Sequence, residues 1–170
     1  MPHKLWAVLA CMTLGVFVAA CGSTRLTPRL VLEQPLTQYR TVHFAAEAAV
    51  AEDVSKQLSD LEEKVLKQLT KEELFQTVLL GKCTDSCSNA VNVIAMLTDI
   101  RKVSSFARIM IGMWAGKATM TSEVNFVDGA SGRILGTYYV HAEDANQGDT
   151  GSLVSRTAKA IVKLIKTNFR

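Results

Sequence analysis

The residues best suited to chemistry in this sequence are two cysteines four positions apart, Cys83 and Cys87. They lie in a polar stretch, residues 82–89. In an oxidising compartment such a pair is expected to form a structural disulfide. The loop is so short that chain entropy gives a stabilisation of only about 2 kcal/mol. A catalytic redox pair is the weaker alternative, since such pairs usually have the spacing Cys-x-x-Cys.

Other catalytic patterns find little support. The two histidines beyond residue 20, His43 and His141, stand on alternating strand positions and form no ligand-spaced cluster, so no metal site and no cofactor are predicted. Ser131 lies in a predicted turn and not in a Gly-x-Ser-x-Gly elbow between a strand and a helix. Gly112 and Gly116 are too sparse for a phosphate-binding loop. The sequence therefore favours a non-catalytic protein, with an enzyme as an alternative.

A further cysteine, Cys21, follows a segment typical of secretory signals. A short basic region, His3-Lys4, precedes an apolar run, Leu5–Ala20, that ends in two alanines. As a helix the run spans about 24 Å, short of the ~30 Å hydrocarbon core, so a permanent membrane-spanning anchor is the weaker interpretation. The pattern resembles the bacterial lipobox, in which the cysteine is acylated and becomes the first residue. A plain cleaved signal, with Cys21 as an ordinary thiol, is the other alternative.

Acylation of Cys21 would decide where the protein acts. Each buried methylene contributes about 0.8 kcal/mol, and two acyl chains already give stable anchoring. We therefore expect palmitate-type chains on Cys21 to hold the protein on a membrane. Gly22 follows directly, where inner-membrane lipoproteins often carry Asp. By that resemblance the expected location is the periplasmic face of the outer membrane, with inner-membrane anchoring as the alternative.

Two further segments are candidate contact surfaces. Residues 106–116 crowd apolar side chains between two predicted strands. Their simplest role is to complete the core, and an exposed patch for an envelope partner or a membrane is the alternative. The last predicted helix carries a basic stripe that is expected to be solvated and to complement the helix dipole, with anionic headgroups or an acidic partner as the alternative. The patch consists of Phe106, Ile109, Met110, Met113 and Trp114, and the stripe of Arg156, Lys159, Lys163, Lys166 and Arg170.

The composition is that of a single globular domain. The chain has 170 residues, and removal of residues 1–20 would leave enough chain to bury a core. The formal net charge of +3 does not indicate nucleic-acid binding, which calls for a strongly basic domain or stripe. We divide the chain into a lipoprotein signal peptide (1–20), a lipid-anchored tether (21–38) without sustained periodicity, and one domain (39–170).

Hydrophobic periodicity predicts the elements of that domain. Alternating apolar residues predict a strand over Tyr39–Ala45, and a short strand is predicted over Phe75–Leu80. An apolar run predicts a central strand over Val91–Arg101. Steps of three and four predict amphipathic helices over residues 54–69 and over Ser152–Phe169.

A hairpin is predicted in the second half of the chain. Its strands are Ala118–Phe126 and Ile134–Val140, and the turn signal Asp128-Gly129-Ala130-Ser131-Gly132 joins them. Alternation predicts that Ile134, Tyr138 and Val140 share one face.

Three stretches carry a resemblance to a known family: residues 99–101, residues 107–118 with the pattern Arg-x3-Gly-x3-Gly, and residues 127–135 with the pattern Asp-x3-Gly. They resemble an uncharacterised family of Gram-negative envelope lipoproteins, known only as a domain of unknown function. The resemblance spans roughly residues 38–169. More distantly, the layout is similar to the amino-terminal domain of TolB. No established reaction comes with this resemblance, so it implies no catalytic residues.

Pattern and resemblance together predict an α/β fold, more closely an α+β two-layer sandwich. We expect a mainly antiparallel or mixed sheet of about five strands with two amphipathic helices on one face. The expected function is that of a non-catalytic accessory or interaction module in envelope assembly, maintenance or transport. It would bind the membrane through acylated Cys21, an envelope protein as partner, and no nucleic acid. A small lipid- or glycan-binding module is the first alternative and an envelope enzyme the second.

Overall fold

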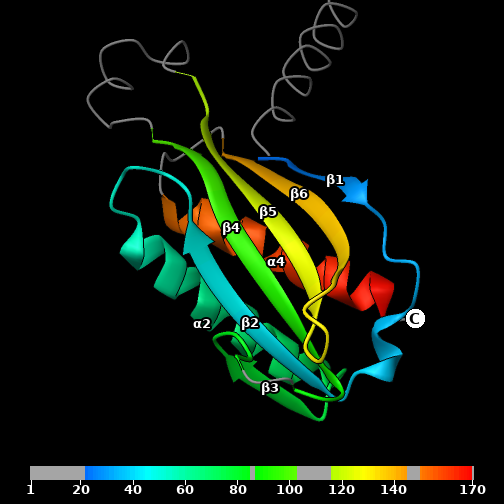
Figure 1. The fold of residues 1–170 in the computed structure, drawn as a ribbon. Helices are drawn as coiled ribbons and strands as arrows, with labels where there is room; N and C mark the ends of the chain where they lie inside the picture. Colours follow the sequence, from blue (N-terminus) through cyan, green and yellow to red (C-terminus); the bar gives the residue numbers. More distant parts are fainter. Residues whose placement is uncertain (1–21, 85–86, 103–115, 145–149, 170) are drawn as a thin grey trace, which may run out of the picture.

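The computed structural model describes residues 22–84, 87–102, 116–144 and 150–169. These residues form one open, mixed sheet of six strands in the order β1-β6-β5-β4-β2-β3, and two helices cover one of its faces (Figure 1). The neighbouring strands β1, β6, β5 and β4 pair antiparallel. Strand β2 runs parallel to both of its neighbours, β4 and β3. The elements are β1 Thr24–Leu30, the 3₁₀ turn η1 Leu36–Gln38, β2 Thr41–Ala48, α2 Ser55–Glu72, β3 Thr77–Leu80, β4 Ala90–Arg101, β5 Ala118–Asp128, β6 Ile134–Asp144 and α4 Thr150–Asn168.

The predicted fold class is confirmed in its coarse form, an α/β fold with a mixed sheet and two helices. The sheet has six strands where about five were expected. The helix predicted over residues 54–69 corresponds to α2, and the closing helix corresponds to α4. The central position predicted for the strand over Val91–Arg101 is also confirmed, because β4 lies between β5 and β2.

The core lies between the sheet and the two helices. Each helix buries the apolar stripe that its sequence predicts, with Leu61, Val65 and Leu69 on α2 and Ile161 and Ile165 on α4 all fully buried. The strands contribute alternate side chains, so one face of the sheet is apolar and the other is mixed. The sheet side of the core includes Val42, Phe44, Val93, Leu97, Met120, Val124, Phe126 and Val140.

The predicted hairpin is formed by β5 and β6, and one carboxylate organises its turn. Asp128 Oδ1 accepts hydrogen bonds from the backbone N–H of Ala130 (3.2 Å) and from the backbone N–H and the hydroxyl of Ser131 (both 2.7 Å). Gly132 has φ 69°, in the left-handed region that glycine adopts without strain. The turn predicted from the sequence over residues 128–132 is therefore present in the structure.

The segment predicted as a tether contains a strand, so that part of the prediction is wrong. Thr24–Leu30 form β1, which pairs antiparallel with β6 at one edge of the sheet. Most of its side chains are exposed. The strand therefore contributes backbone hydrogen bonds to the sheet but few side chains to the core. Pro28 is tolerated there since an edge strand has one side without a partner strand. Farther along, Leu36 is fully buried and fixes the chain against the core.

The prediction for Ile134 is also wrong. Its side chain is 52% exposed, whereas Tyr138 and Val140 are buried. The register of the hairpin shifts between Phe126, which pairs with Gly136, and Val127, which pairs with Ile134. This bulge adds one residue to β6 and turns Ile134 away from the core.

Among the described residues, no helix is both long enough and apolar enough to cross a membrane.

Candidate functional site

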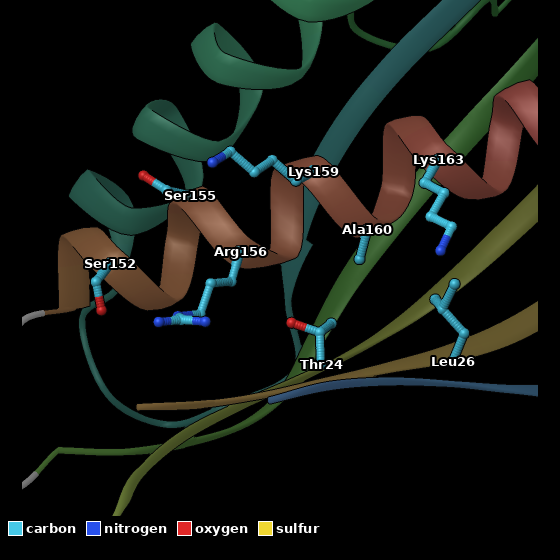
Figure 2. A pocket seen from close by; sticks show the side chains of 8 residues that line it. All are labelled: Thr24, Leu26, Ser152, Ser155, Arg156, Lys159, Ala160 and Lys163. Carbon is cyan, nitrogen blue, oxygen red and sulfur yellow. The ribbon is translucent and has the colours of Figure 1, made fainter. Parts of the chain in front are cut away.

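A groove lies between α4 and the edge strand β1, with a volume of about 590 Å³. Figure 2 shows Arg156 and Lys163 extending from α4 toward β1. The groove is open to solvent along the side of the helix. Its walls are Thr24 and Leu26 from β1 and Ser152, Ser155, Arg156, Lys159, Ala160 and Lys163 from α4.

The groove follows from the way in which β1 and α4 meet the sheet. Leu26 pairs with Val140, and Thr24 with Ala142, so both side chains lie on the face that the helices cover. The apolar stripe of α4 turns into the core, which leaves the flank with Lys159 and Lys163 above β1. The basic stripe predicted from the sequence is thus one wall of a groove, and β1 is the other.

The cations of α4 have different surroundings. Arg156 Nη1 donates a hydrogen bond of 2.7 Å to the carbonyl oxygen of Gly22. Lys166 forms an ion pair with Glu72 of α2, outside the groove. In the part of the chain that the structure describes, Lys159 and Lys163 have no carboxylate within ion-pair distance. Ammonium groups without a counter-charge suit a phosphate or a carboxylate ligand.

The opposite, uncovered face of the sheet carries a row of polar side chains at one end of β5 and β6. Lys117 Nζ lies 2.9 Å from Glu143 Oε2, His141 Nε2 lies 3.4 Å from Glu143 Oε1, and Thr121 Oγ1 lies 2.9 Å from His141 Nδ1. The hydrogen bond from Lys117 is the main cause that holds the pKa of Glu143 below its usual range. A hydroxyl, an imidazole and a carboxylate are the groups of a nucleophilic triad. Here Thr121 on β5 bonds its cross-strand partner His141 on β6, and Glu143 lies two positions farther along β6, which is an ordinary arrangement of polar residues on a sheet surface.

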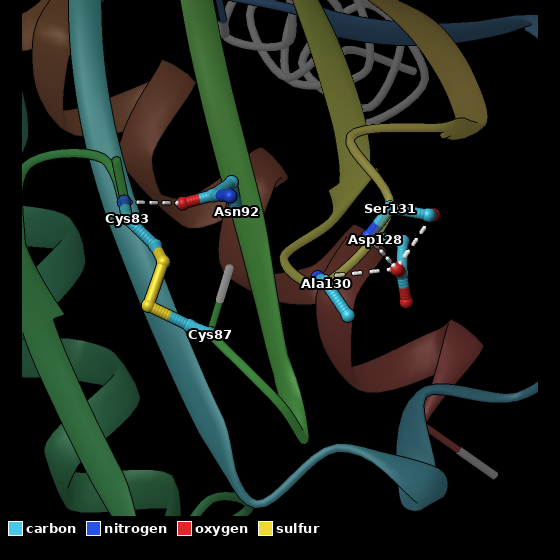
Figure 3. The surroundings of a disulfide bond; sticks show 6 residues. All are labelled: Cys83, Cys87, Asn92, Asp128, Ala130 and Ser131. Atoms are coloured by element: carbon cyan, nitrogen blue, oxygen red, sulfur yellow. Dashed lines mark hydrogen bonds between the residues drawn. A yellow bond between two sulfur atoms is a disulfide. The ribbon is translucent and has the colours of Figure 1, made fainter. Parts of the chain in front are cut away.

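The two cysteines singled out in the sequence form a disulfide, with 6.2 Å between their Cα atoms (Figure 3). The bond lies near the turn between β5 and β6, beside a second open groove of about 360 Å³ that Cys83, Asn92 and Asp128 help to line. No spacing in the sequence connects either cysteine with a histidine. In the structure, one ring nitrogen of His43 and the two sulfur atoms lie within 4.8 Å of one another.

Several predicted site residues lie outside the described part of the chain. These are the lipidation candidate Cys21, the apolar surface candidates Phe106, Ile109, Met110, Met113 and Trp114, and the last residue of the basic stripe, Arg170.

The sequence and the fold both have counterparts among known proteins. The family described as Domain of unknown function (DUF4410) matches residues 27–148. Among solved structures, the chain is similar to the PelC dodecamer from Paraburkholderia phytofirmans, at 10% identity and a TM-score of 0.57, over 85% of this chain and 97% of that chain. It is also similar to the hypothetical protein CT253 from Chlamydia trachomatis, at 10% identity and a TM-score of 0.51, over 76% of this chain and 97% of that chain. No curated protein matches the sequence. At such low identity these likenesses concern the fold alone.

Proposed function

This chain belongs to the family described as Domain of unknown function (DUF4410), and we propose that it acts as a lipid-anchored lipoprotein of the cell envelope. The proposed anchor is Cys21, acylated after removal of residues 1–20, and the proposed location is the periplasmic face of the outer membrane. The role is that of a non-catalytic accessory or interaction module in envelope assembly, maintenance or transport. The similarity to the amino-terminal domain of TolB stays a prediction.

The observation that carries this proposal is the position of the basic groove beside the residues that follow Cys21. Arg156 binds the carbonyl oxygen of Gly22, and Thr24 lines the groove wall. Consecutive Cα atoms lie about 3.8 Å apart, so acyl chains on Cys21 would enter a membrane next to the groove. Lys159 and Lys163 would then face the phosphates of anionic headgroups.

The expected free energies assign different effects to the acyl anchor and to the basic groove. Acyl chains supply the membrane affinity, at about 0.8 kcal/mol per buried methylene. A lysine or arginine close to an anionic surface adds only about 1 kcal/mol. The cations of the groove therefore add little to retention of the protein on the membrane. Their effect is on orientation, because they favour poses in which α4 and β1 face the lipid.

The anchor is tested by labelling cells that produce the full chain with a clickable fatty acid. We expect the wild-type chain to take up the label and to stay with membranes after a high-salt wash. Cys21→Ser should take up no label. Cys11→Ser is the matched control, since it removes a cysteine within the apolar run and should be labelled like the wild type. A wild-type chain that is unlabelled and washes into the soluble fraction would contradict the proposal.

The orientation is tested with a photoactivatable anionic phospholipid in membranes that carry the full chain. We expect peptides from residues 22–30 and 150–166 to be crosslinked, and the exposed side of α2 to be free of crosslinks. Lys159→Gln with Lys163→Gln should lower the yield severalfold. Lys67→Gln with Lys71→Gln removes the same charge from α2 and should leave it unchanged. Equal crosslinking yields for the two double variants would contradict the proposed role of the groove. They would not bear on the acyl anchor, which the labelling experiment tests separately.

Self-association is a second form that the interaction could take. The name of the PelC structure describes a dodecamer, so a protein with this fold assembles into twelve copies. In this chain the open sheet ends at β1 and β3, and Leu79 and Leu80 of β3 are 42% and 59% exposed. An exposed strand edge with apolar side chains is a template for pairing. Light scattering of the purified chain should give a mass above that of one copy, and Leu80→Lys should lower it.

The alternatives have less support in the described residues. A binder of lipid or glycan would need an enclosed apolar or aromatic-lined cavity, whereas the groove between α4 and β1 is open and basic. An enzyme would need polar groups that converge in a cleft, whereas Thr121, His141 and Glu143 lie on the uncovered sheet face, the first two as a cross-strand pair and the last two on one strand.

A further inference from the structure

One histidine nitrogen and two cysteine sulfur atoms, which become metal ligands when the cysteines are thiolates, come together near one end of the sheet. They are a ring nitrogen of His43 on β2 and the sulfur atoms of Cys83 and Cys87, which lie between β3 and β4, all within 4.8 Å of one another. His43 Nδ1 is buried and makes no hydrogen bond to the residues that the structure describes. A buried polar atom without a protein partner is uncommon, because its desolvation is not compensated. His43 is therefore suited to a ligand that the protein itself does not provide.

The two cysteines are held near His43 by contacts other than the disulfide. The backbone N–H of Cys83 donates to Asn92 Oδ1 at 2.8 Å (Figure 3), and Asn92 is the partner of His43 in the β2–β4 register. The backbone N–H of Cys87 donates to the carbonyl oxygen of Gly129 at 3.0 Å. These bonds attach the loop to β4 and to the β5–β6 turn. Reduction of the disulfide would leave both anchors in place.

We propose that, when the disulfide is reduced, Cys83, Cys87 and His43 bind one thiophilic d¹⁰ cation, for which Zn²⁺ is the reference ion. Two thiolates and one imidazole are a ligand set that zinc accepts, with water or another ligand in the fourth position. Around a tetrahedral ion with Zn–S bonds of about 2.3 Å and Zn–N bonds of about 2.0–2.1 Å, neighbouring donors lie about 3.5–3.8 Å apart. That spacing is compatible with donors within 4.8 Å of one another and with cysteine Cα atoms 6.2 Å apart. The groove that Cys83 lines gives access from solvent.

The chemistry couples metal binding to the redox state. A dithiol reductant transfers two electrons and two protons to the disulfide, becomes a disulfide itself, and leaves Cys83 and Cys87 as thiols. Binding of Zn²⁺ then displaces two protons as the thiols become thiolates. The oxidised protein lacks two of the three ligands, since disulfide sulfur is no longer a thiolate. The site can therefore bind metal in the reduced protein only. This inference does not depend on the proposed membrane anchor.

The test is a zinc titration of the full chain against a chromogenic chelator, before and after reduction with a phosphine, which takes up one oxygen atom from water as it is oxidised. We expect one additional zinc equivalent to bind after reduction, and Cys83→Ser with Cys87→Ser to abolish it. That variant keeps Cys11 and Cys21, so binding by those thiols is subtracted. Cobalt in place of zinc should give the thiolate charge-transfer absorption in the reduced wild type alone. Copper(I) in a second arm tests whether the site prefers that ion, and tighter copper binding also supports the proposal.

Two histidines on the same sheet face give a matched comparison. His43→Gln should weaken zinc binding at least about tenfold, because loss of an outer-shell partner alone already costs 10–100-fold. His141→Gln should leave it unchanged. Should His43→Gln not fold, zinc should protect His43, and not His141, from diethylpyrocarbonate in the reduced wild type. Equal zinc binding by oxidised and reduced protein would overturn the proposal, as would wild-type affinity in folded His43→Gln or the absence of protection at His43.

Discussion

The turn between β5 and β6 gives the sharpest test of the fold, through the substitution Asp128→Ala. The two carboxylate oxygens of Asp128 accept four hydrogen bonds, three from Ala130 and Ser131 and one of 2.8 Å from the hydroxyl of Tyr39. A hydrogen bond to a charged group contributes about 1.5–3 kcal/mol, and less where water competes at a partly exposed turn. We expect the free energy of unfolding to fall by about 2–4 kcal/mol.

The assay is urea-induced unfolding followed by circular dichroism, at neutral pH and in acid. The bonds to Ser131 are the main cause that holds the pKa of Asp128 below its usual range. A lowered carboxyl pKa contributes stability above the unfolded-state pKa, and this contribution is lost as pH falls through the native pKa. The difference in the free energy of unfolding between the wild type and Asp128→Ala should therefore become smaller in acid. Tyr39→Phe removes one bond only and should cost about 1 kcal/mol at neutral pH. A neutral-pH difference below about 0.5 kcal/mol, or a gap that does not narrow in acid, would refute the reasoning.

Three further predictions concern other parts of the same domain. Burial and the hydrogen bond to Asp128 raise the pKa of Tyr39 to about 12, so thermal stability should decline as pH rises from about 10 to 12, and Tyr39→Phe should reduce that decline. Leu61→Ala should cost about 2–5 kcal/mol in urea unfolding, whereas Leu79→Ala, at a side chain 42% exposed, should cost less than about 0.5 kcal/mol. Gly129→Ala should lower stability by about 1–3 kcal/mol in the same assay, because the added Cβ would lie 2.7 Å from the carbonyl oxygen of Ala90.

The predictions from sequence succeeded where local pattern and tertiary contact agree. The stripes of α2 and α4 are the residues that the core buries, and the turn at Asp128 carries its own hydrogen-bond acceptor. Strand β1 was missed because its evidence is not local. Thr24–Leu30 have mostly exposed side chains, and only the free edge of β6 makes a strand of them.

The candidate sites depended on arrangements that the sequence does not encode in one segment. The basic stripe on α4 was visible, but the groove exists because β1 forms its second wall. The neighbourhood of His43 and the two cysteines arises from the parallel pairing of β2 with β4 and from the path of the chain between β3 and β4. His43 and Cys83 are forty positions apart in the sequence, so no ligand spacing marks the cluster. The prediction for Ile134 was wrong for a similar reason, because no residue type in the sequence indicates the bulge in β6.

If Cys21 carries the proposed acyl anchor, its short separation from β1 keeps the domain close to the membrane. Only Gly22 and Ser23 separate them, and a chain of about 150 residues has a radius of gyration of about 15 Å. A domain held by an acyl anchor at that point would stay within roughly its own diameter of the lipid surface. It would meet partners by lateral diffusion in two dimensions, and a partner on the opposite membrane would have to extend across the intervening space to reach it.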